Sequence, residues 1–381
     1  MRIALVGCGY VADFYVKTLA NHPRLQVAGV VDRDRSRAER FARCHRLRRY
    51  ESLGDILSDR GVDLVVNLTN PASHHEVSRA ALVAGKHVYS EKPLAMSYDQ
   101  AEQLVAMAEE RGLALAGAPC SVLGECAQTI WKALREGAIG TPRVAYAELD
   151  DGPVHLMDYG SWTSASGNPW PVKDEFEVGC TLEHAGYYVN WFVNFFGPAT
   201  RVTSFASTLV PDKGIKLDVA SPDFTVGCIE FASGVVARIT CSIYAPHDHQ
   251  LRIAGDKGVI SIADCWDYGS PVYLSKRSKI GLRAEKHPRL AKATGLGPKR
   301  VQLARKPAFV HKTKGSNPMD FARGIAEVAE SVAEKRPCRM SSRFALHVNE
   351  IVLALQNPAQ MGSPRTLVST FEPMAPMPWA V

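Results

Sequence analysis

The sequence predicts an α/β fold: a doubly wound parallel sheet in the N-terminal part, followed by an α+β domain with a mainly antiparallel sheet. Apolar runs alternate with helical patterns up to about residue 122, and later strand patterns follow one another through short glycine turns. The 381-residue length suits two domains, and 46% apolar with 22% charged residues is ordinary for a globular protein.

Residues 1–122 are expected to form the first domain. Their apolar runs are uninterrupted, as is typical of parallel strands covered on both faces. Helical patterns separate these runs, so they read as consecutive strand–helix–strand units. Strands are predicted at 3–6, 26–31, 62–68 and near 85–89. One helix is predicted directly after the first strand, a second ends near Ala84, and a third covers 98–111.

Residues 123–381 are expected to form the second domain. Several of its strands are separated by Ser233-Gly234 and by the turn at 255–258, both typical of antiparallel pairs. Helical apolar spacing between 319 and 356 closes the chain. Strands are predicted at 224–231, 235–244, 250–254 and 259–263, and closing helices at 319–335 and 344–356.

The turn after the first strand is the most informative local feature. Gly7-Cys8-Gly9-Tyr10-Val11-Ala12 fits the pattern in which Gly7 permits a tight turn and Gly9 lets the backbone approach a pyrophosphate. The helix that follows presents free N–H groups to the phosphates. Asp32 ends the second strand, 23 residues after Gly9, where an acid accepts the ribose hydroxyls. These residues, with Tyr10 and Val11, predict a dinucleotide site.

Asp32 favours NAD, because a carboxylate repels the 2′-phosphate of NADP. Arg33, Arg35 and Arg37 follow at once, and one of them could bind that phosphate, or all three could form a solvated face. NAD is the predicted cofactor, with NADP or dual use left open.

Composition argues against several other classes of protein. No apolar run approaches the roughly 18 residues needed to span a membrane, and the chain enters its first strand without a signal sequence, so we expect a cytoplasmic protein without membrane contacts. The nine cysteines are scattered with no CxxC, so neither a disulfide framework nor a zinc site is indicated.

A basic insertion is expected at 276–314, with thirteen Lys and Arg against one acid, Glu285. Only Phe309 is aromatic, which argues against a single-stranded nucleic-acid partner. The segment is interpreted as a solvated loop or an oligomer arm, with contact to an anionic substrate or polymer as the alternative.

Residues 85–95, GKHVYSEKPLA, resemble the most specific signature of the glucose-fructose oxidoreductase, inositol dehydrogenase and MocA (Gfo/Idh/MocA) family. Further similarity at 69–74, at 136–140 and in the later sheet extends the resemblance over essentially the whole chain. It implies a Rossmann first domain, a second domain with an open sheet, a carbohydrate substrate, and a homodimer or homotetramer formed through the open face. It also implies that Thr69, Asn70, Pro71, His74, Glu91 and Lys92 contact the cofactor.

The resemblance implies that Lys92 lies between the nicotinamide and the sugar. Oxidising a carbinol needs a group that relays the hydroxyl proton and stabilises developing oxyanion charge. An ammonium beside a cationic nicotinamide can have its pKa lowered toward that use. Lys92 is therefore the leading catalytic candidate.

The family's second catalytic element is an Asp followed four residues later by a His on one helix face, and here the sequence departs from it. Aligning on the turn at 195–197 puts Glu183 at the Asp position and Tyr187 at the His position. Tyrosine has an unperturbed pKa of about 10 rather than one near neutrality. Tyrosine also occurs here in glucose-fructose oxidoreductase-like members, so Lys92 and Tyr187 could act as a pair.

His184 adds a second interpretation of the same stretch. Family members that are NAD-dependent glycoside hydrolases have a histidine here, and a shift of one residue gives the pair His184 and Tyr188. A structural histidine is the equal alternative. Trp162 and Trp170 are candidates for an aromatic sugar platform, with packing under a loop as the alternative.

Two further features carry weaker expectations. His247-Asp248-His249 has the two histidines of many metal sites, but no third ligand is visible at useful spacing, so we predict a hairpin turn and no metal. Cys120 is expected to line the nicotinamide cleft without taking part in chemistry.

Three functions remain open on the sequence. The leading hypothesis is an oxidoreductase that transfers hydride from a ring carbinol of a sugar to NAD(P), with Lys92 managing the hydroxyl proton. The alternative is an NAD-dependent glycosidase that uses transient C3 oxidation, C2 deprotonation and elimination, and whose basic residues suit an anionic glycoside. The third is a cofactor-sensing regulator, against which the intact Glu91-Lys92-Pro93 argues.

Overall fold

The computed structural model describes residues 1–277, 287, 289, 297–308 and 319–381. Its N-terminal part is a five-stranded sheet in the order β2-β1-β3-β4-β5, with every neighbouring pair parallel. The predicted parallel sheet is therefore confirmed. Its strands are β1 (Arg2–Val6), β2 (Gln26–Val31), β3 (Leu64–Asn67), β4 (His87–Ser90) and β5 (Leu115–Gly117).

Helices cover both faces of this sheet, as the uninterrupted apolar strands require. In β1, Ile3 and Leu5 pack into one buried cluster with residues of α1 and α2, whereas Ala4 and Val6 pack into the other with residues of α4 and α5. The helices are α1 (Ala12–Leu19), α2 (Arg35–His45), α3 (Leu53–Ser58), α4 (His74–Val83) and α5 (Tyr98–Glu110). The strand order reverses between β1 and β3, where α/β sheets bind ligands beyond the carboxyl ends of their strands.

The second sheet has nine strands in the order β13-β12-β11-β10-β6-β9-β8-β7-β14. All neighbouring pairs are antiparallel except β6 and β9, so the expected mainly antiparallel sheet is confirmed. The strands are β6 (Pro142–Asp150), β7 (Ala199–Ser207), β8 (Phe224–Phe231), β9 (Val236–Ser242), β10 (Leu251–Gly255), β11 (Gly258–Ile262), β12 (Val272–Lys276), β13 (Lys299–Val301) and β14 (Arg365–Thr366).

The predicted hairpin at His247-Asp248-His249 is wrong. Residues 243–250 connect β9 to β10, but these strands are not neighbours, because β6 lies between them. The segment is a crossover loop that passes the carboxyl end of β6. Asp150 and Asp248 form an isolated antiparallel bridge there.

Helices cover one face of the second sheet and leave the other face open. In β6, Ala145, Ala147 and Leu149 are buried beneath the helices, whereas Tyr146 between them is 38% exposed on the opposite face. The helices of this part are α6 (Glu125–Arg135), α7 (Val172–Val178), α8 (Cys180–His184), α9 (Gly186–Phe196) and α14 (Pro358–Met361), with α12 (Arg323–Glu334) and α13 (Ser342–Gln356) closing the chain.

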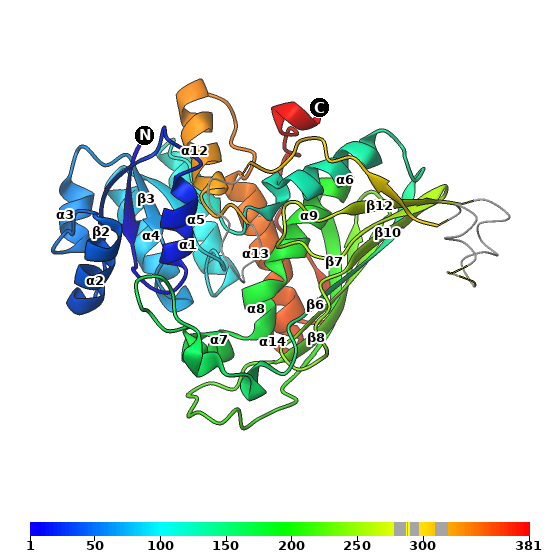
Figure 1. Cartoon of the computed structure of the whole chain (residues 1–381), viewed down its shortest axis with the longest axis horizontal. Coiled ribbons are helices and arrows are strands. Elements are labelled where there is room, and N and C mark those ends of the chain that lie inside the picture. Colours follow the sequence, from blue (N-terminus) through cyan, green and yellow to red (C-terminus); the bar gives the residue numbers. More distant parts are fainter. Residues whose placement is uncertain (278–286, 288, 290–296, 309–318) are drawn as a thin grey trace.

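The closing helices lie between the two sheets (Figure 1). Gly324 of α12 packs against the ring of Tyr89 in the first sheet. Asn349 of α13 exchanges two hydrogen bonds with the backbone of Ala95, of 3.1 and 3.4 Å. The same helix packs on β7 and β8 of the second sheet. These helices therefore join the two halves of the molecule.

Part of the basic segment 276–314 lies outside the described residues. Its described ends continue the second sheet, because Lys276 ends β12 and 299–301 form β13. Arg305 binds the buried carboxylate of Glu125 at 2.7 Å. These ends thus form the last two strands at one edge of the sheet and a packed connection.

None of the helices in the described ranges is long and apolar enough to cross a bilayer. The nine cysteines, all of which are described, are free thiols. Six of them are buried, whereas Cys44 and Cys228 are exposed and Cys338 is partly buried.

Candidate active site

A cavity of about 1230 Å³ lies at the carboxyl ends of β1, β3 and β4, bounded on its far side by α7, α8 and the loop 152–171. Ligand pockets for small molecules commonly measure about 300–1000 Å³, so this one has room for more than a single small ligand. Its lining includes these predicted residues: Gly7, Gly9, Tyr10, Val11, Asp32, Arg33, Thr69, Asn70, Pro71, His74, Glu91, Lys92, Trp162, Trp170, Glu183, His184 and Tyr187.

The glycine turn fits a dinucleotide phosphate. Gly7 has φ +100°, and a Cβ there would lie 2.4 Å from the carbonyl oxygen of Leu68. A Cβ on Gly9 would meet nothing within 4 Å, so the backbone at Gly9 is bare toward the cavity. The turn leads directly into α1 and leaves the helix N-terminus available to an anion.

Asp32 holds the turn as well as facing the cavity. Its carboxylate accepts hydrogen bonds from the backbone N–H groups of Cys8 and Asp34, each at 2.8 Å. Arg37 lies 3.6 Å from the same carboxylate, and Arg33 also lines the cavity. Asp32, Arg33 and Arg37, the residues expected to decide between NAD and NADP, therefore lie together at one end of the site.

The loop 152–171 reaches back from the second sheet to the glycine turn. The side-chain amide of Asn168 donates to the carbonyl oxygen of Cys8 at 2.8 Å, and the hydroxyl of Ser166 donates to Asp13 at 2.6 Å. The loop is thereby fixed over the phosphate end of the cavity.

Trp162 and Trp170 line the cavity from this loop, edge to face with ring centroids 5.2 Å apart. Tyr188 does not line it, because its ring is fully buried and its hydroxyl donates to the backbone carbonyl of His249. Cys120 is 3% exposed and also lies outside the lining, contrary to expectation.

The turn that presents Lys92 is held by its neighbours. The carboxylate of Glu91 accepts the backbone N–H of Lys92 at 2.9 Å. The ring nitrogens of His74 lie 2.7 and 3.0 Å from the carbonyl oxygens of Pro93 and Thr69. His74 is almost fully buried, so it ties the loops after β3 and β4 together from beneath the cavity.

Lys92 and Glu183 form an ion pair at the cavity wall. Burial alone would lower the pKa of the Lys92 ammonium, but the charges of Glu183 and then Glu175 outweigh burial and raise it. Lys92 is therefore a cation in this environment, and the lowering expected from a cationic nicotinamide would act on this raised value. The pKa of Tyr187 is raised by burial, so its phenol is neutral and can donate a hydrogen bond.

Glu175 of α7 lines the cavity, although sequence reasoning missed it. Burial, followed by the charge of Glu183, raises its pKa to about 7. It is thus a carboxyl group that changes protonation near neutral pH beside Lys92. Its only sequence signal is an acidic helix turn, which is usually a solvated face.

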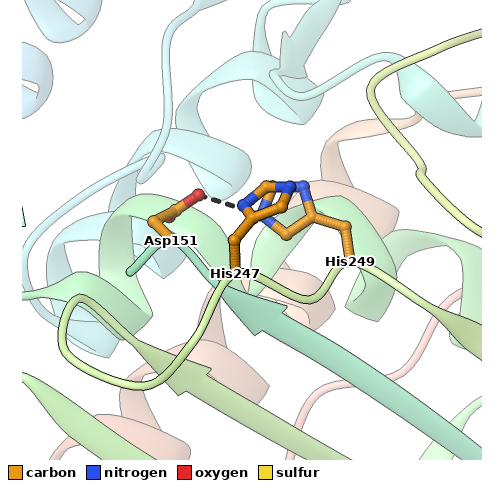
Figure 2. A group of neighbouring side chains, drawn as sticks. All are labelled: Asp151, His247 and His249. Carbon is orange, nitrogen blue, oxygen red and sulfur yellow. Dashed lines mark hydrogen bonds and ion pairs between the residues drawn. The ribbon is translucent and has the colours of Figure 1, made fainter. Parts of the chain in front are cut away.

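A second polar cluster adjoins His184 behind the cavity wall. Nδ1 of His184 lies 3.0 Å from one carboxylate oxygen of Asp151, and Nε2 of His249 lies 2.9 Å from the other. Burial would lower the pKa of His249, but the carboxylates of Asp151 and Asp264 raise it to about 9. Figure 2 shows Asp151 beside His247 and His249, where it supplies the third side chain that the sequence could not reveal.

Two family models match the chain. Residues 1–117 match the oxidoreductase family with an NAD-binding Rossmann fold, and residues 127–261 match the GFO/IDH/MocA C-terminal domain. The chain belongs to the Gfo/Idh/MocA family. The resemblance drawn from the signature around Lys92 is therefore confirmed, and the glycine turn is part of an NAD-binding Rossmann domain.

Several known proteins are similar to this chain at low sequence identity. The trans-1,2-dihydrobenzene-1,2-diol dehydrogenase of Oryctolagus cuniculus is 26% identical over 77% of this chain and 85% of its own. An aldose-aldose oxidoreductase from Caulobacter crescentus has a similar structure, with a TM-score of 0.74 at 19% identity over 96% and 99% of the two chains. The WlbA dehydrogenase from Bordetella pertussis, in complex with NADH and UDP-GlcNAcA, has a TM-score of 0.71 at 17% identity over 97% and 98%.

Proposed function

We propose that the protein is an NAD(P)-dependent oxidoreductase acting on a ring carbinol of a sugar or sugar derivative. The observation that carries the proposal is the Lys92–Glu183 ion pair, which lies in the same cavity as the glycine turn. Membership of an oxidoreductase family supports it. So do a relative named as a dehydrogenase of a cyclic diol and two similar structures, one an aldose-aldose oxidoreductase and the other a dehydrogenase in complex with a nucleotide sugar.

The bound dinucleotide supplies the acceptor for hydride. Gly9 and the N-terminus of α1 would hold its phosphates, and Asp32 would hold its ribose end. The Lys92 ammonium donates a hydrogen bond to the reacting hydroxyl oxygen and stabilises negative charge that develops there. Glu183 keeps that ammonium in place.

Proton movement follows from the charges around Lys92. Because its pKa is raised, Lys92 stays a cation, so it takes up the hydroxyl proton only as it passes one of its own protons to a neighbouring group. Glu175, with a pKa of about 7, is the carboxylate suited to receive that proton. Tyr187 and His184 orient the other hydroxyls, and Trp162 and Trp170 offer apolar ring faces to the sugar.

A paired assay tests this function. Purified protein is supplied with NAD or NADP and a panel of sugars and chromogenic glycosides, neutral and anionic, while reduced cofactor and released aglycone are recorded together. We expect reduced cofactor in stoichiometric amounts without aglycone. Cofactor-dependent aglycone release without net reduction would instead indicate a glycosidase, and cofactor binding without turnover would indicate a sensor.

Lys92→Met tests the role of the ion pair. We expect turnover to fall at least about 100-fold, because the group that relays the proton is lost, while the dinucleotide dissociation constant changes little. Lys257→Met, at an exposed turn of the second sheet, is the matched control. Full turnover in the Lys92 variant would remove this residue from the mechanism.

A further inference from the structure

Backbone pairing places three potential metal ligands on one face. The N–H of Asp248 donates to the carbonyl of Asp150 at 2.9 Å, and the N–H of Asp150 donates to the carbonyl of Asp248 at 3.0 Å. Alternate side chains of extended backbone point to opposite faces, so His247 and His249 share the side away from Asp248. In this antiparallel register Asp151 lies opposite His247, as Figure 2 shows.

The three side chains converge closely enough to share one ion. One ligand atom from each of Asp151, His247 and His249 lies within 4.8 Å of the others. Within the described ranges this is the one group of three or more His, Cys, Asp or Glu side chains that meets this distance. His249 Nε2 and Asp151 Oδ1 are already 2.9 Å apart, so small side-chain adjustments would let all three atoms reach one ion.

The cluster is open to solvent on one side. The His249 side chain is fully buried, that of Asp151 is 14% exposed, and His247 is exposed. The contact between Asp151 Oδ2 and His184 Nδ1 is 3.0 Å long, but it lacks the alignment of a hydrogen bond, and neither atom has another hydrogen-bond partner. This carboxylate oxygen has an ion-pair contact but no aligned hydrogen bond, so it can still serve as a ligand for a metal ion.

We propose that Asp151, His247 and His249 bind a divalent transition-metal ion of the zinc type. Two imidazoles and one carboxylate are ligands that zinc prefers, and water would complete a tetrahedral site. His249 would release the proton on its coordinating ring nitrogen to solvent as the metal binds. The ion would bind through the exposed side of His247 and join the end of β6 to the loop between β9 and β10.

The site lies one layer behind the active-site cavity, because none of its three ligands lines that cavity. Asp151 faces His184, and the ring of His249 packs edge to face against Trp266 with centroids 4.4 Å apart. Both of those neighbours line the cavity. A metal here would therefore fix the wall that carries His184 rather than touch the reacting hydroxyl.

Direct titration of the full-length protein tests the proposal without any activity assay. Protein freed of its purification tag and treated with chelator is titrated with zinc chloride by calorimetry, and with cobalt chloride by visible absorption. We expect one equivalent of each metal to bind, with the intense visible bands of four-coordinate cobalt. His247→Ala and Asp151→Asn should each weaken binding at least about tenfold.

The controls separate metal binding from folding. His247 is exposed, so its truncation leaves the core intact, and circular dichroism and the melting temperature verify the fold. His75→Ala removes a remote surface histidine of α4 and should bind zinc like the wild type. The proposal fails if the wild type takes up no stoichiometric zinc or cobalt, or if His247→Ala binds as tightly as the wild type. The cluster would then be an Asp–His hydrogen-bond network.

Discussion

Glu175 is a partly buried carboxyl group whose raised pKa makes the stability of this protein depend on pH. Burial and the charge of Glu183 raise its pKa to about 7 in the folded protein, from an ordinary value of about 4.3 when unfolded. Its contribution to the free energy of unfolding is thus complete below the unfolded pKa and is lost as pH rises through about 7. Glu175→Gln removes this loss, so the variant should melt about 2 °C or more above the wild type near pH 8.

The measurement is thermal unfolding of both proteins from roughly pH 5 to pH 8. The difference in melting temperature should grow with pH across this range. Glu110→Gln, which changes an exposed acid at the end of α5, should follow the wild type. Parallel pH profiles for wild type and Glu175→Gln would contradict the raised pKa.

Some site residues could be predicted because their chemistry is local in the chain. Gly7 and Gly9 occupy one turn, and Lys92 lies in an eleven-residue signature. Asp151 and Glu175 could not be predicted, because each acts through partners from other segments. Asp151 is 98 residues from His249, and no spacing pattern links two segments that a sheet crossover brings together.

At the scale of elements, the loop 152–171 is fastened to the glycine turn by Asn168. Its amide bond to the Cys8 carbonyl should contribute about 0.5–1.5 kcal/mol to the closed loop position. Asn168→Ala should therefore weaken NAD binding by roughly 2- to 10-fold while changing the melting temperature little. Isothermal titration with NAD measures the dissociation constant.

Ser161→Ala is the matched control for this prediction. The Ser161 hydroxyl donates to the carbonyl of Asp158 within the same loop and makes no bond to the turn. The NAD affinity of the Ser161→Ala variant should equal that of the wild type. Equal losses in both variants would mean that the loop acts through its general order and not through Asn168.

Strand positions were easier to predict than strand partners. The pattern at 224–231 coincides with β8, and those after it match β9, β10 and β11 to within two residues. The insertion of β6 between β9 and β10 was missed, because β6 begins at Pro142, far earlier in the chain. Alternating burial defines a strand locally, whereas its neighbour depends on the packing of the whole sheet.

For the whole molecule, the open face of the nine-stranded sheet is the surface on which we expect two subunits to pair. Tyr146 lies near its centre, with the guanidinium carbons of Arg238 and Arg252 at 5.2 and 5.9 Å from its ring centroid. A stable pair buries about 1,200–2,000 Å² in total. Tyr146→Asp should place a desolvated charge in that interface and shift the protein to monomers.

Light scattering coupled to size-exclusion chromatography measures the mass of each form at matched concentration. Tyr244→Asp changes an exposed tyrosine in the loop after β9 and should keep the wild-type mass. A monomeric wild type, or an unchanged mass for Tyr146→Asp, would show that this face does not join subunits.

The last long helix also bears on how the chain is made. Ala345 and Leu346 of α13 belong to the same buried cluster as Val6 and Leu104 of the first sheet and its helices. More than 220 residues separate the end of β5 from Ala345. At the usual speed of a ribosome, about 5–20 residues per second, the emerging nucleotide-binding half waits roughly 10–50 seconds with part of its apolar surface bare. We therefore expect chaperones that shield nascent chains to bind this half during synthesis.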